Sequence, residues 1–179
     1  MLFSHEMQTP SLPSPWVTRH APQITAGGSV LDLACGSGRN AFWLAAQGFR
    51  VTALDRDAAA LAGLADVSGI TVVKADLENA PWPFPNMRFE GIVVCRYLYR
   101  PLLPLLLQSL SPGGVLIYET FMQGQETLGR PRNPDFLLLP DELPGVCAGL
   151  QILAFEQGCF SEPEPAWVQR ICARSATAR

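Results

Sequence analysis

The sequence predicts a single α/β domain in which a mostly parallel β-sheet carries helices on both faces. Short apolar segments of strand length alternate with segments that favour helix, which is the order of a parallel sheet with crossover helices. The strand-like segments are almost continuously apolar, as expected for strands buried on both faces. With 179 residues, 48% hydrophobic and 16% charged, the chain can bury one core. We expect residues 1–15 to form an irregular N-terminal arm and residues 16–179 to form the domain.

The first half of the predicted domain begins with a helical turn near residues 16–20, followed by alternating strands and helices. We expect strands at 29–34, 50–54 and 70–74, and helices at 40–47 and 57–65. Gly48 is well suited to end the first of these helices, and the side chain of Asp57 can cap the second.

The second half continues this alternation and then departs from it. We expect strands at 89–95 and 115–120, a helix at 102–110 closed by Ser-Pro-Gly-Gly, a polar loop at 122–133, a short helix at 140–149 and a terminal hairpin of residues 151–157 and 166–173. The hairpin requires antiparallel strands at the end of the sheet.

Composition and charge argue against several functional classes. The net charge of −3 and the absence of a Lys/Arg run make a nucleic-acid partner unlikely and favour a small-molecule substrate. Five dispersed cysteines without a C-x-x-C pair predict reduced thiols and no metal site. No apolar run reaches the ~20 residues of a membrane span, and no secretory signal is recognisable, so we expect a cytoplasmic protein without a membrane partner. The oligomeric state is not predicted.

A glycine-rich loop and three acidic residues predict a nucleoside site. Gly36 and Gly38 follow a strand and open a helix, where backbone N–H groups face the bound ligand. Asp55 ends the next strand about 20 residues on, the position from which a carboxylate accepts hydrogen bonds from ribose hydroxyls. Asp32 lies in the strand before the loop, where it would repel a pyrophosphate but suit a cationic ligand. Asp76 follows the third strand and could accept from an adenine amino group.

These residues resemble motifs of a known enzyme family. The stretch Val-Leu-Asp-Leu-Ala-Cys-Gly-Ser-Gly-Arg-Asn-Ala at 30–41, with Asp55 and Ala-Asp-Leu at 75–77, is similar to motifs I to III of class I S-adenosylmethionine-dependent methyltransferases. The first motif is particularly similar to the tellurite-resistance type of small-molecule methyltransferase. The resemblance covers about the whole chain from residue 16, and it implies a Rossmann-like, seven-stranded sheet whose last strand is antiparallel.

The resemblance also implies which residues bind the cofactor, S-adenosyl-L-methionine, and its product S-adenosyl-L-homocysteine. Gly36 and Gly38 would pass under the methionine part, Asp32 would support its ammonium group, Asp55 would hold the ribose, and Asp76 with Leu77 would take the adenine. Further cofactor contacts are expected from the neighbouring residues of these motifs and from the end of the fourth strand, namely Ala34, Cys35, Asn40, Arg56 and Cys95. Many family members have an acidic or aromatic residue directly after the fourth strand, whereas this chain has Arg96 and Tyr97.

The substrate is expected at the carboxyl edge of the sheet, in front of the polar loop at 122–133. The substrate candidates are Tyr97, Tyr99, Arg100, Arg130 and Arg132. The arginines offer planar guanidinium groups to a carboxylate or phosphate, or they form ordinary surface ion pairs. No catalytic residue follows from the sequence, although Glu119, Tyr97 and His20 are candidates for a general base.

Three other functions remain open. The same glycine loop and Asp55 could bind a nicotinamide cofactor in an oxidoreductase, although Asp32 and the terminal hairpin argue against this. The sheet could also serve as a non-catalytic cofactor-binding module or partner subunit. An RNA methyltransferase would need only a local patch of arginines.

Overall fold

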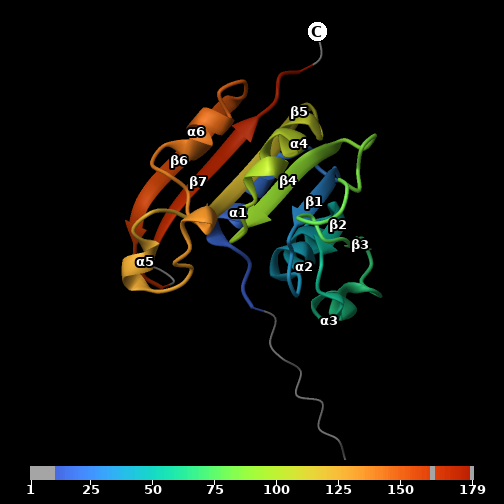
Figure 1. The fold of residues 1–179 in the computed structure, drawn as a ribbon. Helices are drawn as coiled ribbons and strands as arrows, with labels where there is room; N and C mark the ends of the chain where they lie inside the picture. The colour runs from blue at the N-terminus through green and yellow to red at the C-terminus, as the bar shows by residue number, and fades with distance from the viewer. Residues whose placement is uncertain (1–10, 162–163, 178–179) are drawn as a thin grey trace, which may run out of the picture.

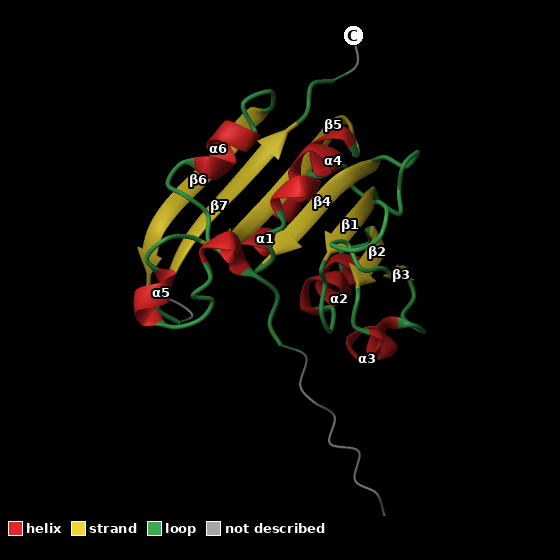
Figure 2. Cartoon of the chain, in the orientation of Figure 1, coloured by secondary structure: helices red, strands yellow, loops and turns green. Residues whose placement is uncertain are grey.

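The computed structural model describes residues 11–161 and 164–177, which form one seven-stranded sheet with helices on both faces (Figures 1 and 2). The strand order is β3-β2-β1-β4-β5-β7-β6. The strands are β1 Ser29–Leu33, β2 Arg50–Asp55, β3 Ile70–Lys74, β4 Phe89–Cys95, β5 Leu110–Phe121, β6 Gln151–Phe160 and β7 Ala166–Arg174. The first five are parallel to one another, and β7 pairs antiparallel with both β5 and β6. The predicted fold class and the terminal hairpin are therefore confirmed.

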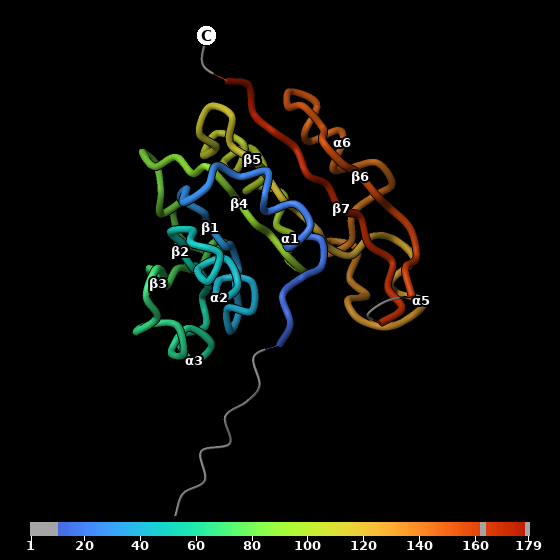
Figure 3. Tube along the Cα trace, turned by 180° about the vertical axis from the view of Figure 1, so that it is seen from behind, coloured from blue at the N-terminus to red at the C-terminus, as the bar shows by residue number. Residues whose placement is uncertain are grey.

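The helices divide between the two faces of the sheet, as the view from behind in Figure 3 shows together with Figure 1. They are α1 Pro15–His20, α2 Arg39–Ala46, α3 Ala58–Leu61, α4 Leu103–Gln108, α5 Gln125–Leu128 and α6 Glu142–Val146. One core cluster joins α1, α2 and α3 to the sheet, and the other joins α4 and α6. Alternate residues of β1 serve the two clusters, Val30 the first and Leu31 the second, because successive strand side chains point to opposite faces. No helix of the described residues is both long and apolar enough to cross a membrane.

Local capping follows the sequence in the first half of the chain. The Asp57 side chain accepts hydrogen bonds from the N–H groups of Ala59 and Ala60 and begins α3. Gly48 follows α2 with a φ of +89°, the left-handed conformation in which glycine ends a helix. The helix expected at 57–65 is shorter than predicted: α3 ends at Leu61 and continues as a 3₁₀ turn, Ala62–Leu64, which includes Gly63, a weak helix former.

The Ser-Pro-Gly-Gly segment was wrongly predicted to be only the turn after a helix. Helix α4 ends at Gln108, and β5 already begins at Leu110, which pairs with Phe89. The strand is irregular between Leu110 and Val115, and Gly114 allows this irregularity because a Cβ there would lie 2.9 Å from the Phe89 carbonyl oxygen. Backbone pairing thus extended a strand that turn composition had predicted to begin at residue 115.

The segment at 122–133 is more ordered than its polar composition predicted. It contains α5, and a 3₁₀ turn follows at Pro134–Phe136. Gln125 is buried, and its amide group donates to the Arg130 carbonyl and accepts from the Trp167 N–H. A single buried side chain therefore ties this segment to β7.

Only part of the expected N-terminal arm lies within the described residues, since residues 1–10 are outside them. Ser14 is buried and caps α1, accepting from the N–H groups of Trp16 and Val17. The Ser14 backbone N–H donates to the Asn40 side-chain oxygen at 2.9 Å. The end of the arm is thus packed against the beginning of α2.

Candidate functional site

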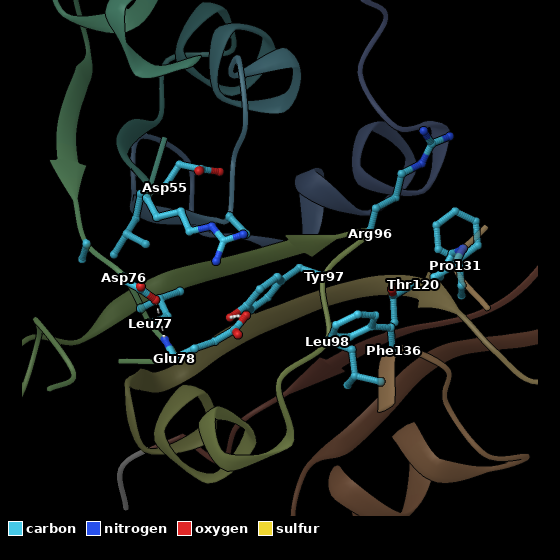
Figure 4. Close-up of a pocket in the computed structure, with 15 residues that line it drawn as sticks. Asp55, Asp76, Leu77, Glu78, Arg96, Tyr97, Leu98, Thr120, Pro131 and Phe136 are labelled. Atoms are coloured by element: carbon cyan, nitrogen blue, oxygen red, sulfur yellow. Dashed lines mark hydrogen bonds between the residues drawn. The ribbon is translucent and has the colours of Figure 1, made fainter. Parts of the chain in front are cut away.

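A cavity of about 380 Å³ lies beyond the carboxyl ends of β1, β2, β4 and β5 (Figure 4). Its volume falls within the ~300–1,000 Å³ usual for small-molecule sites. We call it the first cavity. It is lined by Ala34, Leu54, Asp55, Arg56, Ala75, Asp76, Leu77, Glu78, Arg96, Tyr97, Leu98, Thr120, Phe121, Pro131 and Phe136. Six of the residues predicted to bind cofactor or substrate are among them: Ala34, Asp55, Arg56, Asp76, Leu77 and Tyr97.

Asp55 lies at the end of β2 and connects this strand to the glycine loop. Its Oδ2 accepts a hydrogen bond from the Gly36 N–H at 2.8 Å, and its Oδ1 accepts one from the Asp57 N–H at 2.9 Å. Each carboxylate oxygen has a second lone pair, which leaves it able to accept from a ligand in the cavity.

The two glycines of the loop are required for different reasons. Both have positive φ values, +56° for Gly36 and +85° for Gly38. A Cβ on Gly36 would meet nothing within 4 Å, whereas a Cβ on Gly38 would lie 2.4 Å from Leu64 Cδ2. Gly38 therefore allows the start of α2 to pack on Leu64, and Gly36 leaves open space beside the loop.

Asp32 is buried beneath the loop with one oxygen unsatisfied. Its side chain is 1% exposed, and Oδ2 has no hydrogen-bond partner. Burial raises the pKa of this carboxyl to about 7, against the lowering effect of a backbone hydrogen bond from Ala41 and of nearby Arg39. A buried carboxylate without a partner is costly, so this position favours a cation or a hydrogen-bond donor beside it.

The opposite edge of the first cavity is formed by residues after β3. Asp76 accepts from the Glu78 N–H and from the Asn79 side chain, and the bond from Asn79 is the main reason its pKa is lowered. The Tyr97 hydroxyl lies 3.4 Å from Glu78 Oε1, and its ring points toward this edge in Figure 4. Leu77, which lies between Asp76 and Glu78 in the sequence, is buried and also lines the first cavity.

The cysteines near the site are neutral thiols. Burial is the main cause that raises the pKa of Cys35 and of Cys95, and nearby carboxylates raise both further. A thiolate nucleophile at either position is therefore disfavoured. Within residues 11–161 and 164–177, no group of three His, Cys, Asp or Glu side chains could hold a metal ion.

A second cavity of about 300 Å³ adjoins the first. Arg96, Thr120 and Phe121 line both, so the two cavities share a rim at the ends of β4 and β5. The remaining lining residues of the second cavity are Pro15, Arg39, Glu119, Phe160, Glu164, Ala166, Val168 and Arg170. Arg96 has a φ of +56°, a strained backbone conformation of the kind that clusters at functional sites.

Comparison with known proteins agrees with this geometry. Residues 30–114 match the family model described as a methyltransferase domain. This match agrees with the resemblance to class I S-adenosylmethionine-dependent methyltransferases that the sequence motifs predicted. The cofactor of this family is S-adenosyl-L-methionine.

Solved structures resemble this chain over nearly its whole length. The crystal structure of TehB from Haemophilus influenzae is 20% identical with a TM-score of 0.76, and the match covers 97% of this chain and 65% of that one. The N-methyltransferase NodS from Bradyrhizobium japonicum is 18% identical with a TM-score of 0.67, covering 89% and 93%. At these identities the likeness concerns the fold.

A curated protein named Hemagglutinin 1 from Eikenella corrodens is 28% identical over 150 residues, which cover 78% of this chain and 49% of that protein. This chain therefore spans about half the length of the curated relative and about two thirds of TehB.

Several residues predicted to contact the substrate lie outside the two cavities. Arg100 forms a two-pronged ion pair with Glu142, with 2.6 and 2.9 Å between nitrogen and oxygen atoms, and donates to the carbonyls of Asp135 and Leu137. Because its guanidinium nitrogens donate to these groups, Arg100 fixes the segment before α6. It lines neither cavity. Tyr99 packs against the core instead.

Arg130, Arg132 and His20 also lie outside the lining of the two cavities, whereas Glu119 does not. Arg130 and Arg132 line a shallow hollow with Asn133, and only Pro131 and Phe136 connect this hollow to the first cavity. The His20 ring packs on Trp16, with 4.1 Å between ring centroids, and burial lowers its pKa. Neither cavity is lined by His20, whereas Glu119 lines the second.

Sequence reasoning missed several residues of the second cavity, namely Arg39, Phe121, Phe160 and Arg170. Phe121 and Phe160 end β5 and β6, so the rule that ligands gather at strand ends could have identified them. Arg170 lies inside β7, and only the register, which places it opposite Glu119, brings it to the cavity.

Proposed function

We propose that this chain transfers a methyl group from S-adenosylmethionine to a small-molecule acceptor, with the cofactor in the first cavity. The observation that carries the proposal is the position of Asp55. It stands between the glycine loop and the first cavity, with Asp76 and Leu77 on the opposite edge. These are the groups that a ribose and an adenine require, at the expected ends of three neighbouring strands.

The proposed contacts run along the cavity. Asp55 accepts from the ribose hydroxyls, Asp76 accepts from the adenine amino group, and the backbone N–H of Leu77 donates to a ring nitrogen. Ala34 and Arg56 line the loop side, and Tyr97 forms a wall. Cys35, Asn40 and Cys95 lie outside the cavity lining and support it: Cys35 donates its N–H to the Leu54 carbonyl, and Asn40 is buried at the start of α2.

Asp32 and the glycine loop fit the methionine end of this cofactor. The unpartnered Oδ2 of Asp32 suits an ammonium group, directly or through a water molecule. The open space at Gly36 leaves room for a ligand against the loop, while Gly38 serves packing on Leu64. The same carboxylate would repel a pyrophosphate, which disfavours a nicotinamide cofactor.

When bound, S-adenosylmethionine supplies an electrophilic methyl group, so the protein's main task is to align the acceptor with it. A hydroxyl or amine acceptor would also need a base. Glu119 is the carboxylate we propose for that role, because it lines the second cavity near the shared rim. Its Oε1 accepts a hydrogen bond from the Ser14 hydroxyl, which fixes the carboxylate in place.

Calorimetric titration with S-adenosylmethionine, S-adenosylhomocysteine and NAD tests the proposal. We expect both methionine nucleosides to bind and NAD not to bind. Turnover is then measured as S-adenosylhomocysteine formed with a panel of thiols, amines, carboxylates and RNA. NAD binding without a response to the nucleosides would overturn the proposal, and cofactor binding without any turnover would favour a non-catalytic module.

A cytoplasmic location, tested by cell fractionation, is part of the same proposal.

A further inference from the structure

We infer that the second cavity is the acceptor site and that it takes a small apolar molecule carrying a carboxylate. The inference rests on the proposed function, since it places the acceptor next to a cofactor in the first cavity. The proposed cofactor site and the second cavity have only the shared rim of Arg96, Thr120 and Phe121 in common.

The charge in this cavity favours an anion. Three guanidinium groups line it, from Arg39, Arg96 and Arg170, against two carboxylates, from Glu119 and Glu164. Glu156, outside the lining, offsets part of the Arg170 charge, whereas Arg39 and Arg96 form no ion pair with a described residue. Their positive charge lies in a partly enclosed space, where electrostatic interactions are stronger than in open water.

Arg96 is the proposed anchor for the carboxylate. It makes no ion pair with any other described residue, and its side chain lies over the Phe121 ring, with 5.9 Å from Cζ to the ring centroid. In Figure 4 its side chain extends away from Tyr97 and the adenine edge. A free guanidinium group on the shared rim can form a two-pronged hydrogen bond with a carboxylate.

Arg170 provides a second, pre-oriented positive group. Its Cζ lies 4.1 Å from the centroid of the Phe160 ring and 5.5 Å from that of Trp16. Its Nε is buried without a hydrogen-bond partner, although Glu156 Oε2 lies 3.4 Å away. Contacts with two aromatic rings thus already restrict the guanidinium group, so ligand binding costs little further side-chain entropy.

The remaining walls are apolar and define the rest of the ligand. Phe121, Phe160, Val168, Ala166 and Pro15 contribute carbon surface around the charged groups. A small inorganic anion would leave this surface in contact with water, whereas a compact aryl or alkyl group would cover it. A carboxylate on an apolar body matches both parts of the lining.

Benzoate and benzamide form a suitable pair of probes, since they share shape but differ in charge. Each is titrated into the full chain with S-adenosylhomocysteine present, and binding is followed by saturation-transfer NMR. We expect benzoate to bind about 10-fold more tightly than benzamide, the effect of one charge-assisted contact. Equal affinities would overturn the inference, and so would competition between benzoate and S-adenosylhomocysteine, because benzoate would then occupy the first cavity.

Variants locate the binding site. Arg96→Gln should lower benzoate affinity to that of benzamide, and Arg96→Lys should restore part of it, since charge returns without the planar fork. Arg88→Gln removes the same charge from an exposed position before β4 and should change nothing. Unchanged benzoate binding in Arg96→Gln would contradict the anchor. If Arg96→Gln does not fold, the probe pair on the unaltered chain and Arg170→Gln decide the question.

These experiments separate the inference from the proposed function. Titration with S-adenosylhomocysteine alone reports on the first cavity, and benzoate without the nucleoside reports on the second. Failure of nucleoside binding with preserved, Arg96-dependent benzoate binding would reject the cofactor proposal and keep the anion site. The opposite result would reject only the acceptor class.

Discussion

Asp55 and Gly36 are joined by a hydrogen bond of 2.8 Å between the carboxylate Oδ2 and the backbone nitrogen of the glycine loop. The residue proposed to hold the ribose therefore also fixes the loop proposed to pass under the methionine part. Binding and loop geometry depend on the same side chain, which leads to the first prediction.

Asp55→Ala should weaken S-adenosylhomocysteine binding by about 1–3 kcal/mol, because it removes the acceptor of the ribose hydroxyls and releases the loop. Calorimetry measures the affinity. Asp57→Ala is the matched control: it removes the cap of α3 and should cost about 0.5–2 kcal/mol of stability, while leaving the affinity unchanged because Asp57 does not line the first cavity. Equal affinities in Asp55→Ala and the unaltered chain would show that the ribose site is elsewhere.

Asp32 should make the stability of the protein depend on pH. Its pKa is raised to about 7 in the folded protein by burial, from 3.8 when unfolded, so the folded state binds a proton more tightly. The free energy of unfolding should therefore decrease as the pH rises from about 4 to about 7. Above about pH 7, Asp32 should contribute no further change with pH. Asp32→Asn should flatten this dependence, which denaturant titrations at several pH values would reveal. An identical pH profile in the variant would contradict the raised pKa.

The same carboxyl predicts proton release on cofactor binding. At pH 6, below its pKa of about 7, Asp32 is mostly protonated, and an ammonium group beside it would favour the charged form. Calorimetry of S-adenosylhomocysteine binding in buffers with different ionisation enthalpies should show release of a fraction of a proton at pH 6 and less at pH 8. Asp32→Asn serves as the control and should abolish the difference.

Gly38→Ala should destabilise the protein more than Gly36→Ala. Both substitutions place a Cβ on a backbone of positive φ, but only at position 38 would it lie 2.4 Å from Leu64. We expect overpacking to add about 1–3 kcal/mol to the loss at Gly38. Leu64→Ala in the Gly38→Ala background should recover part of this loss in a double-mutant cycle. Equal losses at the two glycines would argue against the packing role.

Arg100→Gln should loosen the segment before α6. The substitution removes the ion pair with Glu142 and two hydrogen bonds to carbonyls, and we expect a loss of about 1–3 kcal/mol, since the pair is partly exposed. Trypsin should cleave faster after Arg132, where no proline follows. Arg19→Gln, which breaks a more exposed pair with Glu156, is the control and should leave this cleavage unchanged.

The parallel part of the sheet and the first cavity could largely be predicted from the sequence. Apolar runs of strand length and the glycine loop fix which segments are buried and where each strand ends. Because parallel strands share one carboxyl edge, Asp55, Asp76 and Tyr97 were expected to meet, and all three line the first cavity. These signals are local, since each depends on residues within one strand and the loop that follows it.

Only the tertiary structure decided the second cavity and the roles of the arginines. Arg170 reaches the cavity through the register of β7 with β5, and Arg100 is withdrawn from it by Glu142, 42 residues away in the chain. The start of β5 likewise depended on its pairing with Phe89 and not on its turn-like composition. Side chains with equal chemistry in the sequence thus acquire different functions, because long-range packing and strand register determine which charges are paired and which remain free for a ligand.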